Sequence, residues 1–346
     1  MAEQSNVDPY LKRMHQSGIF TNYGPLVQEL ELRYSEHLNV RPEQVVITSS
    51  GTQALFSLAS VMDPSRWIVP DWTFTATGLA VMQSGKDLLF QDVDQKSWRL
   101  GIFSKKTEYG YVIVAPFGGK IGLTDLPARS FVIVDAAASL GSKEDLSGLQ
   151  ENQSVMFSLH ATKVLGCGEG GIAVCGSTEV AERVRRNINF GFWGDRISLI
   201  NSTNGKMAEM QAAYALAALD GWIDEQHDWS ITHDACHQLS EEYKLDTGPT
   251  ALDGRNPYWI VDFHSSSARE HVEKVLSEHL VGTKRWWPVP LSDMPAFVNV
   301  RHDNAPNSRL LSTTTLGLPC YRGLSDQDVS RISLALRRAL NEMPTS

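Results

Sequence analysis

Cysteine is scarce in this chain of 346 residues, and its four copies follow no metal-binding or redox spacing. Cys167, Cys175, Cys236 and Cys320 are scattered, and none of them forms a CxxC pair. This spacing supports neither a zinc site nor a disulfide framework. We therefore predict reduced thiols and no bound metal.

Long apolar runs and clusters of basic side chains are also missing. No stretch approaches the length of a membrane-spanning helix, and the N-terminal segment lacks the apolar core of a signal peptide. The formal net charge is −9, and no block of lysine or arginine is present that would bind a phosphate backbone. These features predict a cytoplasmic protein that binds neither a membrane nor nucleic acid.

The first half of the chain alternates between strand-like and helix-like segments. Apolar residues at helical spacing predict a helix over 25–38, and further helices are expected after the first two strand-like runs. Short runs rich in β-branched residues predict strands at 45–48, 67–70, 88–93, 111–117, 131–135 and 171–176. Such alternation indicates an α/β fold, and the continuously apolar runs indicate a mostly parallel sheet buried on both faces. Ligands of such sheets bind beyond the carboxyl ends of the strands.

The second half is more helical, and its length suggests a smaller second domain. Helical patterns follow from residue 179, a strand is expected near YWIVDF, and an amphipathic helix closes the chain. We predict a large α/β domain over residues 1–223 and a small C-terminal α+β domain over 224–346.

The segment Ser49-Ser50-Gly51-Thr52 follows a predicted strand and opens a predicted helix. Backbone N–H groups at a helix N-terminus bind phosphate well, because the helix dipole is positive there. A serine beside a glycine at this place is also an ordinary helix cap, and the segment alone does not distinguish the two.

Two charged residues stand next to buried strands. Asp135 ends the run FVIVD and is followed by three alanines, which leaves a carboxylate at the ligand-binding edge of the sheet; a helix cap or a solvated loop carboxylate is the alternative. Lys163 lies between an apolar strand and a glycine-rich turn, a setting that suits imine formation with a carbonyl compound. Most lysines are simply solvated surface residues.

The glycines after Lys163 formally match a dinucleotide-binding fingerprint through Gly166, Gly168 and Gly171. That fingerprint requires a helix after it, whereas the strand-like run IAVCG follows here. We therefore interpret these glycines as a tight turn that allows close approach of the backbone.

Several segments, in order, resemble motifs of the DegT/DnrJ/EryC1/StrS family of pyridoxal-phosphate (PLP) dependent sugar aminotransferases. The similarity extends from about Phe20 to the final helix. The matching segments are TNYGPLVQELE, SSGTQAL, PDWTFTAT, VDAAASLGS, FSLHATKVLGCGEGG, NGKMAEMQAA, WWPVPLSDMPAF and LGLPCYRGLSDQDV. The resemblance implies a PLP-dependent transferase type I (aspartate aminotransferase-like) fold, with a mostly parallel mixed sheet flanked by helices.

The resemblance also implies a role for individual residues. Lys163 would form the Schiff base and later carry the proton, and Asp135 would pair with the pyridinium nitrogen of PLP. The other residues implied to bind the cofactor are Phe74 by stacking, Gly51, Thr52 and Ser158 at the phosphate, and Asn204 at the phosphate of the neighbouring subunit, which makes the enzyme a homodimer with shared sites. Trp286, Trp287, Tyr321 and Arg322 are candidates for the wall of a sugar-binding opening or for ordinary packing.

The implied reaction moves an amino group from L-glutamate, through the pyridoxamine form of the cofactor, to a nucleotide-linked keto-deoxysugar for amino sugar or surface polysaccharide synthesis. Transamination of a cyclitol or another ketone, and a PLP-binding protein without turnover, remain alternatives; a sugar dehydratase of this fold is disfavoured because it carries histidine in place of Lys163. The chain departs from the family at Ala138, where glutamine or histidine normally approaches the phenolic oxygen of the cofactor. That contact is either lost or supplied by another residue.

Overall fold

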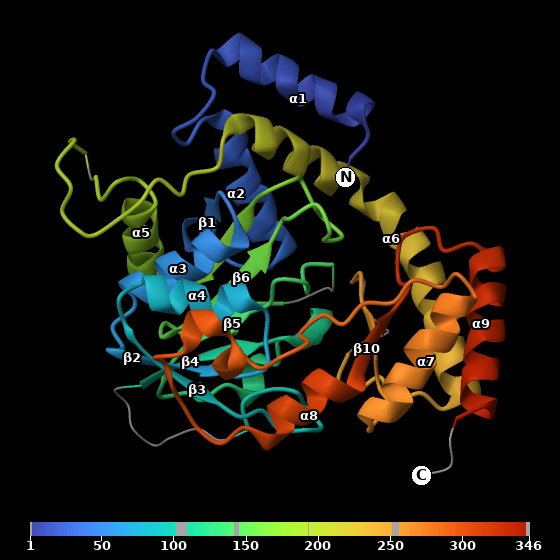
Figure 1. Ribbon diagram of the computed structural model, residues 1–346. Helices are drawn as coiled ribbons and strands as arrows, with labels where there is room; N and C mark the ends of the chain where they lie inside the picture. The colour runs from blue at the N-terminus through green and yellow to red at the C-terminus, as the bar shows by residue number, and fades with distance from the viewer. Residues whose placement is uncertain (1, 102–108, 142–144, 193, 251–255, 344–346) are drawn as a thin grey trace.

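A computed structural model describes residues 2–101, 109–141, 145–192, 194–250 and 256–343 (Figure 1). Its helices are α1 Gln4–Ser17, α2 Pro25–His37, α3 Gly51–Val61, α4 Thr75–Gln83, α5 Thr178–Asn187, α6 Glu209–Tyr243, α7 Ser266–Glu278, α8 Pro306–Thr314 and α9 Asp326–Asn341. Its strands are β1 Val45–Thr48, β2 Arg66–Pro70, β3 Asp87–Gln91, β4 Tyr109–Val114, β5 Phe131–Asp135, β6 Gln153–Ser158, β7 Gly171–Cys175, β8 Trp259–Asp262, β9 Arg301–His302 and β10 Thr315–Leu318.

The main sheet has the strand order β1-β7-β6-β5-β4-β2-β3-β9 within the described residues. Neighbouring strands from β6 to β9 pair in parallel, whereas β7 runs antiparallel to both β6 and β1. Two reversals cancel, so β1 points in the same direction as β6. The carboxyl ends of β1, β2, β4, β5 and β6 therefore share one edge of the sheet.

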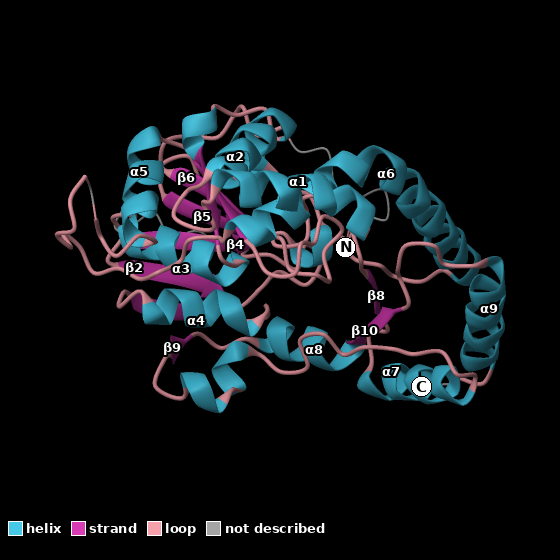
Figure 2. Cartoon of the chain, turned by 90° about the horizontal axis from the view of Figure 1, so that it is seen from above, coloured by secondary structure: helices cyan, strands magenta, loops and turns pink. Residues whose placement is uncertain are grey.

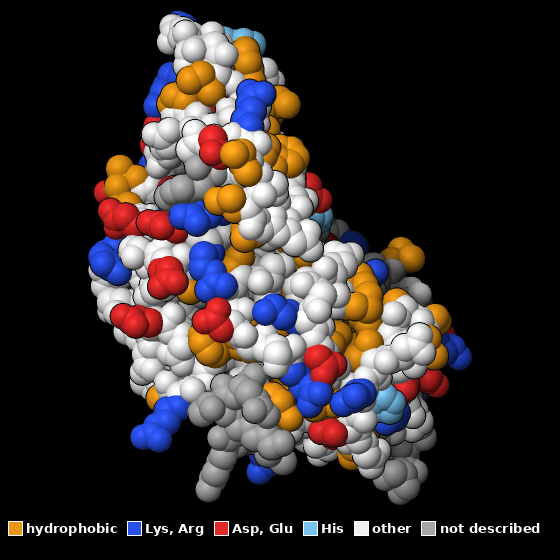
Figure 3. Space-filling model, turned by 90° about the vertical axis from the view of Figure 1, so that its left-hand side faces the viewer, with side chains coloured by type: hydrophobic (Ala, Val, Ile, Leu, Met, Phe, Trp, Pro, Cys, Tyr) orange, Lys and Arg blue, Asp and Glu red, His pale blue; other side chains and the backbone are white. Residues whose placement is uncertain are grey.

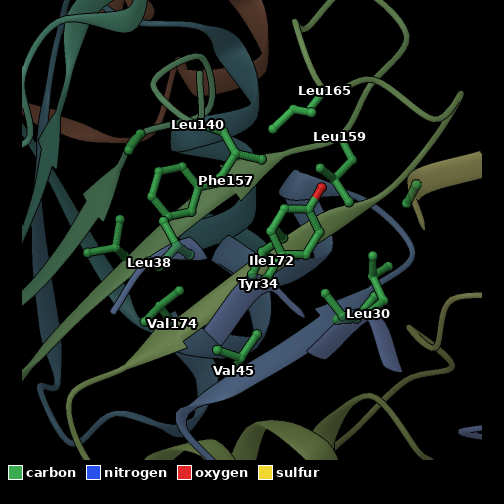
Figure 4. Packing of buried hydrophobic residues seen from close by; sticks show 14 of the residues in the cluster. Leu30, Tyr34, Leu38, Val45, Leu140, Phe157, Leu159, Leu165, Ile172 and Val174 are labelled. Atoms are coloured by element: carbon green, nitrogen blue, oxygen red, sulfur yellow. The ribbon is translucent and has the colours of Figure 1, made fainter. Parts of the chain in front are cut away.

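Helices cover both faces of this sheet and bury a separate apolar layer on each. One layer combines side chains of α2 and α6 with the sheet. Figure 4 shows Leu30 and Tyr34 of α2, and Leu38 directly after it, facing Phe157, Ile172 and other strand residues. The opposite layer combines α3, α4 and α5 with alternate residues of the same strands. Burial on both faces explains why the central strands are apolar throughout, and it confirms the predicted α/β architecture.

The C-terminal part contains the two-stranded antiparallel sheet β8–β10. Its core consists of buried side chains from these strands, α7, α9 and the last turns of α6. Helix α6 is continuous from Glu209 to Tyr243 and extends from the main sheet to the side of α9 (Figure 2). The predicted boundary between residues 223 and 224 falls inside this helix, and the division into two domains stays a prediction.

Most predicted elements form, and the differences include α1, β4 and β3. Helix α1 was not predicted because its sequence is mostly polar, and only Val7 and Met14 of its residues are buried. Strand β4 ends at Val114 and not at residue 117, since Pro116 has no N–H for the ladder and Phe117 has a φ of 50°. Strand β3 ends at Gln91, short of the predicted residue 93. Across the described residues, we find no helix with the length and apolarity to cross a membrane.

Candidate active site

The predicted site residues gather at the shared carboxyl edge of the main sheet. Asp135 is the last residue of β5 and Ser158 is the last residue of β6. The turn after β1 contributes Ser50 and Gly51, and the turn after β2 leads through Phe74 into α4. The fold thus brings together segments that are far apart in sequence, at the place where sheets of this kind bind ligands.

Asp135 is a buried carboxylate held in a fixed orientation. Its side chain accepts hydrogen bonds from the Thr77 hydroxyl, at 2.7 Å, and from the backbone N–H of Ala137, at 3.2 Å. Burial raises the pKa of Asp135 above its ordinary value, although these two hydrogen bonds and the charge of Lys163 act in the opposite direction. A carboxylate in this state favours an additional cationic or N–H partner.

Thr77 itself is positioned by the start of α4. Its hydroxyl lies 3.1 Å from the hydroxyl of Thr73, so Thr73, Thr77 and Asp135 form a short buried chain of hydrogen bonds. Thr77 is one turn beyond Phe74, whose ring is 61% exposed at the N-terminus of the helix. The large exposure leaves the Phe74 ring available for stacking.

The β1–α3 turn has the geometry of an anion site. The Ser50 hydroxyl accepts the N–H of Gln53 and so caps α3, which leaves the N–H groups of Gly51 and Thr52 without a partner inside the helix. A Cβ on Gly51 would lie 3.1 Å from both Ser158 Cβ and Met156 Sδ. Glycine therefore lets the helix start approach the end of β6. The cap predicted as one alternative is present, and phosphate binding at the same turn stays a prediction.

Lys163 occupies the tight turn between β6 and β7. Its backbone N–H donates to the carbonyl of His160, and its own carbonyl accepts the N–H of Gly166. A Cβ on Gly166 would lie 2.6 Å from the His160 carbonyl oxygen, so this turn requires glycine there. The predicted tight turn is thus present, and it directs the lysine side chain toward the C-terminal part of the chain.

The Lys163 ammonium donates a hydrogen bond of 2.6 Å to the hydroxyl of Tyr258, and it lies 4.9 Å from the centre of the same ring. Both side chains line a cavity of about 360 Å³. Trp229, Trp286, Tyr321 and Arg322 also line it, and Arg322 forms an ion pair of 2.5 Å with Glu225. Trp286, Tyr321 and Arg322 thus line a cavity beside Lys163, and sugar binding there stays a prediction.

Trp287 has a different position from the one expected of a cavity wall. Its ring stacks on Phe117 with 4.0 Å between the ring centres, and its carbonyl accepts the Trp72 indole N–H. Trp72, Trp98, Phe117, Ala138 and Tyr258 belong to the same buried apolar group, which we call the aromatic cluster. This cluster fills the space beside Ala138 with rings.

Asn204 lies on an exposed segment that runs back along the β1–α3 turn. Its side-chain oxygen accepts a hydrogen bond of 2.7 Å from Lys206, and the carbonyl of the next residue, Gly205, accepts the N–H of Ser49. The predicted contact of Asn204 with a neighbouring subunit is not tested by a single chain and stays a prediction.

Comparison with known proteins decides among the families that this geometry admits. A family model described as the DegT/DnrJ/EryC1/StrS aminotransferase family matches residues 2–105 and 127–337. The chain belongs to this aminotransferase family. The family predicted from the sequence is therefore confirmed.

Individual relatives agree with that membership. A dTDP-4-amino-4,6-dideoxy-D-glucose transaminase from Shigella dysenteriae is 28% identical and covers 95% of this chain and 94% of the relative. A GDP-perosamine synthase from Escherichia coli O157:H7 is 24% identical and covers 92% of each chain.

Solved structures confirm the fold. A putative PLP-dependent aminotransferase from Bacillus cereus superimposes with a TM-score of 0.85 at 22% identity, covering 97% of this chain and 98% of that one. The crystal structure of DesI in the presence of its TDP-sugar product gives a TM-score of 0.83 at 26% identity, covering 99% and 91%. The chain has the fold of PLP-dependent aminotransferases, and PLP is its cofactor.

The described residues fit this cofactor. Within the described part of the chain, Asp135 accepts hydrogen bonds from Thr77 and Ala137 but forms no ion pair, so its charge suits a protonated ring nitrogen. The free N–H groups at the start of α3 suit a phosphate, and Lys163 supplies an amine on the same edge of the sheet.

Two residues at the site were not among the predicted ones. Thr77 belongs to the PDWTFTAT segment, and its place one helical turn after Phe74 is the signal that could have identified it. Tyr258 stands 95 residues after Lys163, and no local pattern indicates that these two side chains meet.

Gly51→Ala should raise the dissociation constant of PLP about tenfold, because overpacking of this kind costs about 1–3 kcal/mol and would push the helix start away from β6. The dissociation constant is measured by quenching of tryptophan fluorescence during titration with PLP. Gly221→Ala is the matched control, since the nearest atom to its new Cβ is Glu225 Oε1 at 3.7 Å. Equal dissociation constants for Gly51→Ala and wild type would contradict the predicted phosphate site.

Proposed function

We propose that this enzyme transfers the amino group of L-glutamate to a nucleotide-linked keto-deoxysugar. The observation that carries the proposal is the position of Lys163, whose amine faces an open aromatic-walled cavity from the same sheet edge that holds Asp135. An amine, a buried carboxylate and a helix N-terminus together match the three groups that PLP presents.

Each residue contributes a separate task in this proposal. Lys163 forms the covalent bond to PLP, and its amine, once released by the incoming amino donor, moves the proton from the donor carbon. Asp135 keeps the ring nitrogen protonated, and Phe74 covers one face of the ring. Gly51, Thr52 and Ser158 hold the phosphate. When bound, PLP supplies an electron sink that stabilises the carbanion formed as the proton leaves.

The substrate class is supported by the relatives and by the cavity. The relatives from Shigella dysenteriae and Escherichia coli carry names that specify dTDP-linked and GDP-linked amino sugars. The cavity beside Lys163 offers the faces and edges of Trp286 and Tyr321 and the guanidinium of Arg322. Aromatic side chains pack well against sugar and base rings, and arginine pairs with phosphate.

A spectroscopic cycle tests the function. L-Glutamate should bleach the visible band of the purified holoenzyme, and the correct nucleotide-linked ketosugar should restore it while its mass changes from ketone to amine. Restoration by 2-oxoglutarate is the control, because it reverses the first half-reaction without any sugar. If no member of a nucleotide-ketosugar panel restores the band, the proposed acceptor is wrong; restoration by a cyclitol ketone would assign the enzyme to that substrate class. A band that glutamate never bleaches would indicate a PLP-binding protein without turnover.

We also propose that the working form is a cytoplasmic homodimer. The four cysteines are free thiols, which agrees with a reducing compartment. The segment after α5 exposes four large apolar side chains, Phe190, Ile197, Leu199 and Ile200. Figure 3 shows the face that holds α5, where apolar side chains lie among charged ones. Asn204 follows on the same segment. A second copy that covers these apolar side chains would therefore bring its own active site close to Asn204 of the first copy.

Replacing both Ile197 and Leu199 with aspartate should convert the protein to a monomer in light scattering, because each side chain is about 60% exposed and a contact there would bury unpaired charges. The affinity for PLP should fall at least about tenfold if Asn204 of one subunit serves the other. Leu280→Asp is the control, since Leu280 is 84% exposed and lies elsewhere. A dimer that survives the double substitution would place the interface on another face.

A further inference from the structure

The hydroxyl of Tyr258 is fixed in the position that it needs to act on Lys163. The residue is only 7% exposed, and its backbone N–H donates to the Asn256 side chain at 3.0 Å. Its ring packs edge-on against Phe117 and Trp286, with centres 5.6 and 5.0 Å apart. The hydroxyl therefore reaches Lys163 without a further loss of side-chain freedom.

The rings around Tyr258 are themselves anchored. Phe117 stacks on Trp287, which is joined to Trp72 by a hydrogen bond from the Trp72 indole to the Trp287 carbonyl. Trp98 packs edge-on against Trp72, with 5.4 Å between the ring centres. Tyr258 consequently belongs to a rigid group of rings. This group connects residues that follow strands of the main sheet with the start of β8, which begins directly after Tyr258.

Ala138 lies in the same aromatic cluster and brings no hydrogen-bonding side chain to it. The resemblance to the family places a glutamine or histidine at this position, near the phenolic oxygen of the cofactor. Tyr258, in the same cluster, carries a hydroxyl group. A side-chain hydrogen-bond donor is thus missing at position 138, and a hydroxyl that can donate is present at Tyr258.

The chemistry of PLP relates these two observations. The carbon that bonds to lysine and the phenolic oxygen are attached to adjacent atoms of the pyridine ring. A hydroxyl that lies 2.6 Å from the lysine nitrogen would therefore be within reach of that oxygen if PLP bonds to Lys163. A phenol donates a strong hydrogen bond to an anionic oxygen.

We infer that the Tyr258 hydroxyl donates a hydrogen bond to the phenolic oxygen of PLP, in place of the side chain that Ala138 lacks, and positions the Lys163 nitrogen beside it. This inference rests on the proposed function, since it requires that PLP bonds to Lys163. A donor to the phenolate stabilises the form in which the lysine–cofactor nitrogen is unprotonated. The contact therefore lowers the pH at which that nitrogen loses its proton.

Other titratable groups surround the same nitrogen and must be held constant. Asp135 lies on β5, and the turn that carries Lys163 also holds His160, which lies 3.8 Å from Glu169. The cavity wall adds Glu225, Cys320, Tyr321 and Arg322. Because all of these remain in Tyr258→Phe, a change in titration can be assigned to the one hydroxyl that is removed.

The test is a pH titration of the visible absorbance of the substrate-free holoenzyme. In Tyr258→Phe the midpoint of the spectral change should rise by about one pH unit, a tenfold change that corresponds to about 1.4 kcal/mol. Tyr321→Phe, which removes a hydroxyl from the wall of the same cavity, should leave the midpoint unchanged. Thermal unfolding of the cofactor-free variants shows whether each substitution preserves the fold.

Three outcomes are distinguishable. An unchanged midpoint in a Tyr258→Phe protein that still forms its visible band overturns the inference and leaves the proposed function intact. A lower stability or weaker PLP binding with an unchanged midpoint assigns Tyr258 a packing role and also overturns it. If borohydride adds the mass of the reduced cofactor to Lys163→Ala as it does to wild type, PLP does not bond to Lys163, and the proposed function and the inference fail together.

Discussion

Lys163→Ala should lower the rate of amino transfer by about 10³-fold or more, because a positioned proton-transfer group alone supplies about 10²- to 10⁴-fold. The wild-type amine faces the cavity and contacts Tyr258, and no other lysine lines that cavity among the described residues. The substitution removes both the covalent attachment of PLP and the group that carries the proton. The measurement is the rate at which L-glutamate bleaches the bound cofactor.

A second substitution, Lys163→Arg, distinguishes covalent attachment and proton transfer from the effect of the positive charge alone. Lys163→Arg keeps a cation near Tyr258 but can neither form the covalent bond nor give up its proton at neutral pH. Borohydride treatment should add the mass of the reduced cofactor to wild type and to neither variant. A small external amine should partly restore turnover in Lys163→Ala and not in Lys163→Arg, where the side chain fills the space. Activity within tenfold of wild type in Lys163→Ala would refute the assignment.

Asp135→Asn should reduce kcat by about 10²- to 10³-fold, the usual effect of removing one buried electrostatic contact that supports a developing charge. An amide has no charge to keep the ring nitrogen protonated, so the cofactor becomes a weaker electron sink. PLP should still bind, since Lys163 and the α3 N-terminus remain. Single-turnover bleaching by L-glutamate measures the chemical step, and a variant with wild-type kcat would exclude this role for Asp135.

The same substitution should stabilise the protein without PLP. Because burial raises the folded-state pKa of Asp135 above the ordinary 3.8, the free energy of unfolding falls as pH rises between those two values. The loss grows as the pH rises through the raised pKa, and the neutral amide avoids it. The amide can donate to Thr77, whose hydroxyl also accepts. We expect the Tm of the cofactor-free variant to be higher by about 2–4 °C at pH 7 and equal to that of wild type in acid. A variant that is both inactive and less stable would point to a folding defect instead.

The sequence predicts those parts of the site whose signals are local. Asp135 ends a continuously apolar strand, and Ser50 with Gly51 marks a capped helix that begins directly after β1. Lys163 is indicated by its place between an apolar strand and a glycine-rich turn. These features depend on residues that are adjacent in the chain, so they can be predicted from the sequence alone.

The remaining parts depend on contacts between distant segments. Tyr258 reaches Lys163 because the segment before β8 packs against Phe117, and Trp287 does not line the cavity because its ring stacks on Phe117. The positive φ of Phe117, which ends the predicted strand early, also belongs to this packing. Side-chain contacts of this kind follow from the three-dimensional arrangement, which periodicity does not encode.

The position of β1 next to β7 has a consequence for protein synthesis. Strand β1, which leads into the phosphate-binding turn, pairs with β7 at the edge of the sheet, although Val45–Thr48 and Gly171–Cys175 are far apart in the chain. At roughly 5–20 residues per second, a ribosome needs on the order of 6–25 s to make the intervening segment. A nascent chain that stops before β7 should therefore not capture PLP, whereas one released after α6 should begin to do so. Borohydride trapping on stalled chains of the two lengths measures the difference, so the order of translation itself delays cofactor loading.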